Sequence, residues 1–251
     1  MSESLRVAVF GAAGRMGRQV CDAVEGAEGL EVVARIDAGD DPKLALEAGA
    51  EVAVDFTTPD AALGNIEFCV ANGIHVAVGT SGFIPEKVAR AEQVLAGNDR
   101  GVGILIAPNF SLGAVLMMRF AAQASAFFES VEIIELHHPN KLDAPSGTAL
   151  RTAQLIAEAR TAAGVAPSPD ATAEDADHHR GGKVEDVTIH SVRLRGLIAH
   201  QEVLLGGVGE TLTIRHDSLD RASFMPGVLL GVREVAKHPG LTVGLEHFLS
   251  L

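Results

Sequence analysis

Along residues 1–110, short apolar runs alternate with longer stretches whose hydrophobic side chains recur at helical spacing. The predicted strands are residues 6–10, 30–36, 51–56, 75–78 and 103–106, and the predicted helices are 15–24, 61–71 and 85–95. Runs such as VAVF and ILI are apolar at consecutive positions, which is typical of strands covered by helices on both faces. This alternation predicts an α/β fold with a parallel sheet.

The pattern changes after about residue 130. The predicted strands there are 131–136, 187–194, 200–205 and 210–215, and in the last of them Leu212 and Ile214 alternate with threonines. Such alternation favours a separate sheet with one wetter face. Residues 149–160 predict a helix and residues 162–183 a long loop, while the tail returns to a helix and a strand. We therefore predict one domain from residues 1–110 and 221–251, with residues 111–220 inserted as a second domain.

Composition and charge narrow the classes of partner. The chain has 251 residues, of which 47% are hydrophobic, and a formal net charge of −13. Such a charge repels nucleic-acid backbones and anionic lipid surfaces, so we expect neither partner. Cys21 and Cys69 lack paired or metal-ligand spacing, and the N-terminus shows no basic leader before its apolar run. No segment approaches the roughly 20 apolar residues that span a bilayer, so we expect a cytoplasmic protein.

A glycine-rich turn, GAAGRMG, joins the first predicted strand to the first predicted helix. Gly11 permits a sharp turn, Gly14 allows a pyrophosphate to approach the backbone, and Gly17 lets helix and strand pack closely. The helix N-terminus supplies amide donors for phosphate. Asp37 ends the second strand, where a carboxylate can accept hydrogen bonds from a ribose. The pattern favours dinucleotide binding, although glycines in such a turn can also serve packing alone.

The same region bears on the choice of nucleotide. Asp37 should repel a 2′-phosphate, whereas Arg15 in the turn could partly neutralise one. We therefore expect NADH to be used and NADPH to be accepted. Two further turns, GTSG at 79–82 and APNF at 107–110, follow predicted strands and are placed to border a nicotinamide, because ligands bind at the carboxyl ends of parallel strands. Ordinary loop chemistry explains both turns equally well.

The stretch ELHHPNKLDAPSGTA, residues 135–149, concentrates chemistry in an otherwise hydrophobic chain. His138, Lys141 and the amides of Gly147 and Thr148 could face one pocket, which would suit an anion such as a carboxylate. A lysine so placed can also donate a proton. The Ser-Gly-Thr turn can alternatively be only a helix N-cap. We predict no metal site, since His137 and His138 are adjacent on an extended segment and point to opposite faces.

With these motifs in order, the chain resembles the dihydrodipicolinate reductase family over essentially its whole length. VAVFGAAGRMGR, VDFTTP, GTSGF, APNFSLG, ELHHPNKLDAPSGTAL and GETLTIRHDSLDR all occur, and the histidine-lysine motif is the most specific. The resemblance implies a Rossmann-like domain completed by the C-terminal helix and strand, an inserted α+β mixed-sheet domain for substrate binding and oligomerisation, and a homotetramer. It also implies reduction of 4-hydroxy-tetrahydrodipicolinate, a small dicarboxylate, in diaminopimelate and lysine biosynthesis.

The resemblance further implies roles for individual residues. His137 would be the general acid or base and Lys141 a proton donor, while Ala38 stands where some members carry an arginine after the ribose-binding acid. The implied substrate-carboxylate contacts are His138, Gly147 and Thr148, and the implied cofactor contacts are Gly11, Ala12, Ala13, Gly14, Arg15, Met16, Asp37, Gly79, Thr80, Ser81, Ala107, Pro108, Asn109 and Phe110. Two other functions stay open: another two-domain NAD-dependent dehydrogenase of amino or keto acids, and a non-catalytic dinucleotide sensor.

Overall fold

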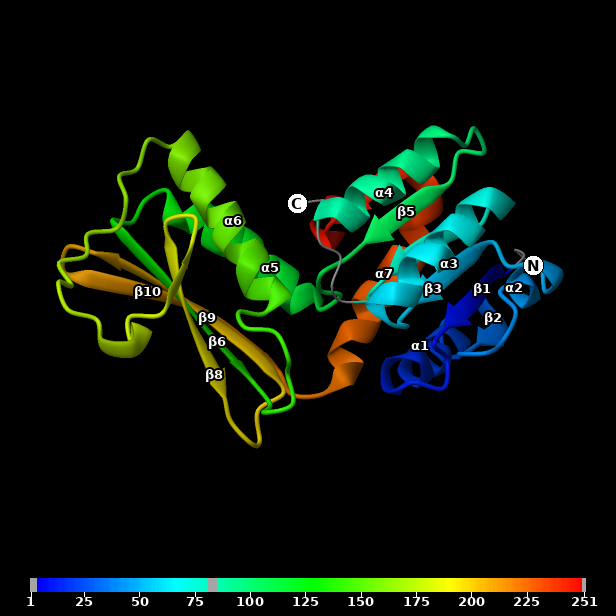
Figure 1. The fold of residues 1–251 in the computed structure, drawn as a ribbon, viewed down its shortest axis with the longest axis horizontal. Coiled ribbons are helices and arrows are strands. Elements are labelled where there is room, and N and C mark those ends of the chain that lie inside the picture. Colours follow the sequence, from blue (N-terminus) through cyan, green and yellow to red (C-terminus); the bar gives the residue numbers. More distant parts are fainter. Residues whose placement is uncertain (1–3, 81–84, 250–251) are drawn as a thin grey trace. The chain divides into compact units, whose positions relative to one another are not determined.

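The computed structural model describes residues 4–80 and 85–249. The chain forms two compact units, Met1–Ser111 with Arg221–Leu251, and Leu112–Asp220. Figure 1 shows each unit as a sheet with its own helices. Hereafter these are called the first unit and the second unit.

The first unit is built on a six-stranded sheet in the order β11-β5-β4-β3-β1-β2 (Figure 1). Every pair of neighbouring strands is parallel. The strands are β1 (Leu5–Phe10), β2 (Leu30–Ile36), β3 (Val52–Asp55), β4 (His75–Val78), β5 (Gly103–Ile106) and β11 (Gly240–Val243). All four residues of β3 and of β5 are buried, as the continuous apolar runs predict.

Helices cover both faces of this sheet. On one face α3 and α4 pack against each other, and on the other α1 packs against α7. Thr58 caps α3 by accepting a hydrogen bond from the Ala61 amide, and Gly73 ends it in the left-handed conformation. The helices are α1 (Arg15–Glu25), α2 (Lys43–Glu47), α3 (Pro59–Asn72), α4 (Pro85–Ala96) and α7 (Met225–Glu234), with 3-10 turns at Arg221–Phe224, Val235–Lys237 and Leu245–Phe248.

The second unit has a five-stranded sheet in the order β10-β9-β6-β8-β7. The sheet is mixed, because β6 runs parallel to β8 and antiparallel to β9. The elements are α5 (Leu112–Ser125), β6 (Ser130–His137), α6 (Gly147–Ala162), a 3-10 turn (Ala176–His178), β7 (Gly182–Val184), β8 (Val187–Arg193), β9 (Ala199–Gly207) and β10 (Glu210–Ser218). Helices α5 and α6 pack together, and their apolar residues form a core with one face of the sheet.

The predicted fold class is confirmed: a Rossmann-like parallel sheet is interrupted by a mixed-sheet α+β segment before the C-terminal helix and strand. Three helices or strands were missed, of which α2 is a helix of only five residues, too short to show a hydrophobic period. Helix α5 buries one side, which includes Ala114, Met118 and Ala121, but its exposed side is also largely apolar or small, so its sequence lacks the alternation of apolar and polar positions that marks a helix. Strand β7 is a three-residue edge strand whose start lies within the predicted loop of residues 162–183.

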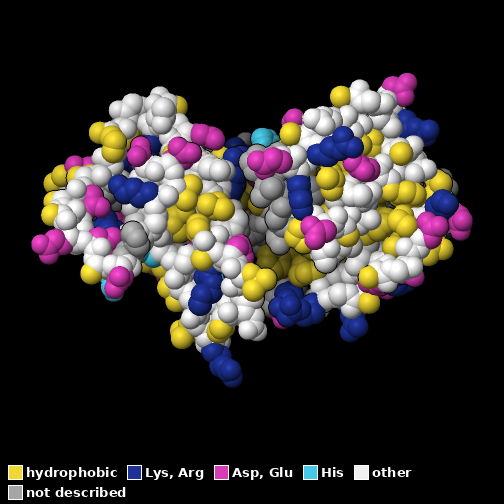
Figure 2. Space-filling model, in the orientation of Figure 1, with side chains coloured by type: hydrophobic (Ala, Val, Ile, Leu, Met, Phe, Trp, Pro, Cys, Tyr) yellow, Lys and Arg dark blue, Asp and Glu magenta, His cyan; other side chains and the backbone are white. Residues whose placement is uncertain are grey.

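The surface charge and the helix lengths bear on whether a membrane or a nucleic acid is a partner. On the face shown in Figure 2, Lys and Arg side chains are scattered among Asp and Glu and do not gather into one patch. Within residues 4–80 and 85–249, no helix has the length and apolar character needed to cross a membrane.

Candidate functional site

The glycine turn between β1 and α1 is shaped by close backbone contacts. Gly11 has a φ of +79°, and a Cβ atom there would lie 2.7 Å from the carbonyl oxygen of Phe56. A Cβ atom on Gly17 would lie only 2.0 Å from the carbonyl oxygen of Gly11. Side chains at either position would push the helix or the neighbouring loop away. The sequence motif therefore reports a real steric requirement in this turn.

The N-terminus of α1 is suited to an anion. Gly14 occupies the N-cap without a side-chain hydrogen bond, and the first turn of the helix contains no acidic residue. A Cβ atom on Gly14 would lie 3.0 Å from the Gly11 carbonyl oxygen, so glycine keeps this turn tight. Amide donors and positive potential at an uncapped helix N-terminus are the features that bind a pyrophosphate. The residues present thus fit a dinucleotide.

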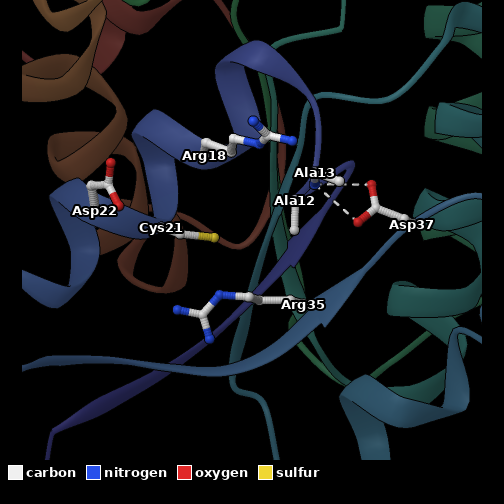
Figure 3. Close-up of a pocket in the computed structure, with 7 residues that line it drawn as sticks. All are labelled: Ala12, Ala13, Arg18, Cys21, Asp22, Arg35 and Asp37. Atoms are coloured by element: carbon white, nitrogen blue, oxygen red, sulfur yellow. Dashed lines mark hydrogen bonds between the residues drawn. The ribbon is translucent and has the colours of Figure 1, made fainter.

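Asp37 lies immediately after β2 and faces this turn. The Ala13 amide nitrogen lies 3.0 and 2.9 Å from its two carboxylate oxygens (Figure 3). Arg18 and Arg35 lie beside a hollow of about 330 Å³ at the same place, and Arg35 is paired with Glu25. The hollow is lined by Ala12, Ala13, Arg18, Cys21, Asp22, Arg35 and Asp37. The two arginines were not among the predicted site residues, although Arg35 stands only two positions before Asp37.

A buried carboxylate organises the next loops. Asp55, at the end of β3, is fully buried and accepts hydrogen bonds from the Thr57 amide at 2.9 Å and the Thr57 hydroxyl at 2.7 Å. Asn65 and the hydroxyl of Thr80 each donate to it at 2.7 Å. The Thr80 side chain is therefore engaged within the protein. Ser81, the next predicted cofactor residue, lies outside the described residues.

Two phenylalanine rings support the loop after β4. A Cβ atom on Gly79 would lie 2.2 Å from the ring of Phe56 and 2.9 Å from that of Phe110, so only glycine fits above them. The rings are 5.7 Å apart, and Phe110 is buried. Ala107 follows β5 and donates its amide to the Val78 carbonyl at 3.0 Å. Gly79 and Ala107 thus lie at the carboxyl ends of adjacent strands, where parallel sheets bind ligands.

Pro108 and Asn109 complete the APNF turn. Pro108 is exposed, and the side-chain oxygen of Asn109 accepts a hydrogen bond from the Ser111 amide at 2.7 Å. On the glycine turn, Arg15 is exposed and Met16 is half-buried. These four residues therefore lie at the surface of the first unit or next to it.

In the second unit, His137 is the last residue of β6 and points to the same side of the sheet as Glu135. The Nδ1 atom of His137 lies 2.5 Å from a carboxylate oxygen of Glu135. The His137 side chain is 12% exposed and that of Glu135 is fully buried. A fully buried glutamate in a strand requires strong partners to offset the cost of desolvation.

Those partners come from three parts of the chain. Both terminal nitrogens of Arg193, at the end of β8, donate to Glu135 at 2.8 Å, and the Ser146 amide donates to it at 3.2 Å. Burial by itself would raise the pKa of Glu135. Hydrogen bonds from His137, Arg193 and Ser191 outweigh that effect and hold the pKa at about 2. Glu135 is therefore an ionised carboxylate inside the protein.

Lys141 is held near the same network through Asp143. Its Nζ lies 2.8 Å from a carboxylate oxygen of Asp143, while Arg193 donates to the Asp143 backbone carbonyl at 2.7 Å. Burial would raise the pKa of Asp143, but the hydrogen bond and charge of Lys141, together with the charge of Arg193 and a backbone hydrogen bond, lower it overall. The lysine thus reaches the Glu135 network by one intermediate residue, and its side chain is 21% exposed.

The N-terminus of α6 supplies the remaining predicted contacts. The Ser146 hydroxyl caps the helix by accepting from the Ala149 amide at 3.1 Å, which confirms the N-cap interpretation for this serine. Gly147 is exposed, and apart from its chain neighbours and its own helix backbone, no atom of the described residues lies within 4 Å of where its Cβ would be. Packing does not require glycine there, so space remains for a ligand beside the helix amides. Thr148 and His138 are half-buried.

Glu135 and Arg193 were missed as functional residues, although a signal for one of them was present. Val131, Ile133, Glu135 and His137 alternate along β6, so a glutamate occupies a position where the pattern calls for an apolar residue. Arg193 lies 58 residues away from Glu135, and only the pairing of β6 with β8 brings them together. In the described part of the chain, no group of three or more His, Cys, Asp or Glu side chains could hold a metal ion.

Comparison with known proteins identifies the family. Residues 5–110 match the family model described as dihydrodipicolinate reductase, N-terminus, and residues 113–249 match that described as dihydrodipicolinate reductase, C-terminus. The chain is 60% identical over 248 residues to a 4-hydroxy-tetrahydrodipicolinate reductase from Nocardia farcinica, covering 99% of this chain and 100% of the relative. It is 60% identical over 247 residues to one from Streptomyces coelicolor, covering 98% of each chain.

A solved structure supports the same assignment. Dipicolinate-bound dihydrodipicolinate reductase from Paenisporosarcina sp. TG-14 superimposes with a TM-score of 0.82 at 37% identity, covering 98% of this chain and 100% of the other. The two family models together match most of both units, and the relatives are covered over nearly their full length. The chain belongs to the dihydrodipicolinate reductase family.

Proposed function

We propose that this protein reduces 4-hydroxy-tetrahydrodipicolinate to tetrahydrodipicolinate with NADH or NADPH, in the diaminopimelate and lysine pathway. The observation that carries the proposal is the Glu135 network. Its hydrogen bonds connect His137, the loop that carries Lys141 and the N-terminus of α6. That arrangement offers acid-base groups and anion donors together. Relatives at 60% identity bear the name of this activity.

The first unit would hold the nucleotide. We assign the pyrophosphate to the turn from Gly11 to Met16 and the adenosine ribose to Asp37. The nicotinamide side is assigned to Gly79, Thr80 and Ser81 with the APNF turn. A bound reduced nicotinamide supplies a hydride. The chain's own contribution is to fix that group by backbone donors and by loops that Asp55 and the Phe56–Phe110 pair hold in place.

The second unit would bind the dicarboxylate and manage the proton. The amides of Gly147 and Thr148, with His138, receive carboxylate oxygens, and the positive end of α6 favours them. Lys141 donates a proton, and His137 acts as general acid or base through its Nε2 atom. Because the Nδ1 atom faces Glu135, only Nε2 is directed away from the network. Fixing a doubly negative ring in this way orients it for reduction and stabilises charge that develops on it.

Nucleotide preference follows from the region around Asp37. Its carboxylate repels a 2′-phosphate, so we propose NADH as the main reductant. Arg15, together with Arg18 and Arg35 beside the hollow of Figure 3, supplies positive charge that makes NADPH acceptable. The absence of a basic residue at Ala38 weakens NADPH binding without abolishing it.

We also propose a homotetramer assembled through the open face of the second unit's sheet, in the cytoplasm. Ile134, Leu136 and Leu204 lie on the face of the sheet opposite to the α5–α6 core and are half-buried. The same face also carries Glu132 and Glu202, so a copy of the chain would pair there through both apolar and charged side chains. Sedimentation equilibrium should give a tetramer mass. The two free cysteines are buried, which suits a reducing compartment.

The test is a coupled assay in which the substrate is generated enzymatically and nucleotide oxidation is followed with NADH and NADPH in turn. We expect turnover with both and a higher kcat/KM with NADH. Nucleotide binding without oxidation would favour a sensor. Oxidation only with other amino or keto acids would favour a different dehydrogenase. Because the chain has no Trp and no Tyr, NADH fluorescence gives a clear binding signal beside the assay.

A further inference from the structure

Glu135 is the point at which the parts of the proposed substrate site meet. One carboxylate oxygen accepts from the Ser146 amide and from Arg193, and the other accepts from Arg193 and contacts His137. Arg193 in turn holds the carbonyl of Asp143, whose side chain pairs with Lys141. Strand β6, the Lys141 loop and the start of α6 are thus tied to one buried group.

We propose that Glu135, paired with Arg193, is a positioning residue. It sets the tautomer of His137 and fixes the positions of the Lys141 loop, residues 138–146, and of the N-terminus of α6. The inference rests on the proposed reductase function, because positioning matters for turnover only if His137 and Lys141 take part in it. Glu135 itself is buried and reaches a substrate only through these neighbours.

The tautomer follows from hydrogen-bond chemistry. An ionised carboxylate accepts hydrogen bonds and donates none, so the atom of His137 that faces Glu135 must carry a proton. In neutral His137 that proton sits on Nδ1, which leaves Nε2 as a base directed away from Glu135. Without the carboxylate, the ring could carry its proton on either nitrogen, and only a fraction of the molecules would present a basic Nε2.

Stability alone does not explain the buried pair. A buried ion pair commonly stabilises a fold no more than apolar residues of the same volume would, because both charges lose their hydration. An apolar residue would also continue the core-facing pattern of Val131 and Ile133 along β6. The glutamate at this position therefore points to a role in orienting the side chains at the ends of β6 and β8, where His137 and Arg193 lie.

The opposite face of the same strand provides a matched control. Glu132 on β6 is also hydrogen-bonded by a histidine and an arginine, since His190 lies 2.8 Å from its carboxylate and Arg180 pairs with it. Burial would raise the pKa of Glu132, but its hydrogen bonds with Arg180 and His190 lower it overall. This second Glu-His-Arg group has the same composition and lies away from His137, Lys141 and the N-terminus of α6, but it is partly exposed on the face proposed for tetramer assembly, so the oligomeric state must be checked with it.

The experiment compares Glu135→Gln with Glu132→Gln. A glutamine has one oxygen, so its amide group must face either His137 or the Ser146 amide with a donor, and one of these contacts is lost. We expect kcat of Glu135→Gln to fall about 10- to 100-fold, the usual effect of losing an orienting partner, while NADH affinity is unchanged. Glu132→Gln should keep kcat within about twofold at the same oligomeric state. Glu135→Asp, which restores the charge on a shorter side chain, should recover part of the loss.

A second measurement reads the wild-type protein directly and needs no turnover. Nitrogen-15 NMR of the histidines of the wild-type protein, with His137 assigned by its loss in His137→Asn, should show neutral His137 protonated on Nδ1. A proton on Nε2 would overturn the inference, as would a folded Glu135→Gln protein with wild-type kcat. If wild-type protein failed to turn over the substrate while the Nδ1 tautomer was observed, the proposed function would fail and the positioning geometry would stand.

Discussion

The two proposed binding regions, one in each unit, are built by opposite means. The turn at Gly11 is defined by side chains that are missing, because a Cβ atom on Gly17 would lie 2.0 Å from a backbone oxygen. The segment around His137 is defined by charged side chains that converge on a buried carboxylate. A turn of glycines offers backbone donors to any phosphate, whereas the charged network can set the protonation of individual groups. Binding and chemistry are thus placed in structures suited to each.

The difference also predicts that substitutions in the two regions have different effects. Substitutions in the network should alter turnover and leave nucleotide binding intact, and substitutions in the turn should do the reverse. The first and third predictions below test this separation, and the second tests the charged network by itself.

The largest effect is expected at the acid-base groups. His137→Ala or Lys141→Ala should lower kcat by about 100-fold or more, since each removes a group that moves a proton in the transition state. NADH affinity, measured by fluorescence titration, should stay within about twofold of wild type. Near-unchanged kcat in both variants would refute the assigned roles.

The next effect concerns stability in acid. The pKa of Glu135 in the folded protein is about 2, below its ordinary value of 4.5, so its contribution to stability is complete above pH 4.5 and declines as pH falls towards 2. Between neutral pH and pH 3, the loss should be on the order of 2 kcal/mol, or about 30-fold in the unfolding equilibrium.

Other carboxylates also titrate in this range, so the comparison is with Glu135→Gln. Urea denaturation at a series of pH values should show a steeper acid decline for wild type than for Glu135→Gln. Parallel curves for the two proteins would mean that Glu135 carries no such stabilisation.

A smaller effect is expected in the turn. Gly17→Ala forces α1 away from the Gly11 carbonyl and displaces its first amides, so NADH should bind about tenfold more weakly. The matched control is Gly64→Ala in helix α3, where among the described residues no atom lies within 4 Å of the added Cβ. That variant should bind NADH as wild type does. Equal affinity of Gly17→Ala and wild type would show that the turn does not hold the nucleotide.

The same contrast explains how far the sequence could predict the molecule. The turn could be predicted because the strand, the glycine motif, the helix and the following aspartate are close together in the sequence. Each glycine of the motif is required by contacts with nearby backbone atoms. The parallel sheet followed from consecutive apolar positions in β1, β3 and β5. Helix α5 was missed because its exposed side is nearly as apolar as its buried side, so the sequence shows no hydrophobic period.

The network was readable only in part. His137 and Lys141 stand out by residue type and by the family motif, but Arg193 becomes relevant only after β6 and β8 pair across 58 residues of chain. Glu135 stands at the start of that motif and interrupts an apolar alternation, yet its burial and its hydrogen bonds depend on the folded structure. Likewise, Asp55 gains its role from Thr80, which is distant in sequence.

The most direct measurement is a crystal structure of the protein with NADH and dipicolinate bound together. The account predicts that Lys141 Nζ and the amides of Gly147 and Thr148 lie within about 3 Å of dipicolinate oxygens, with the ring facing the reactive carbon of the nicotinamide. If dipicolinate bound elsewhere, or if the loop that carries Lys141 stayed far from that carbon in every copy, the account would be contradicted.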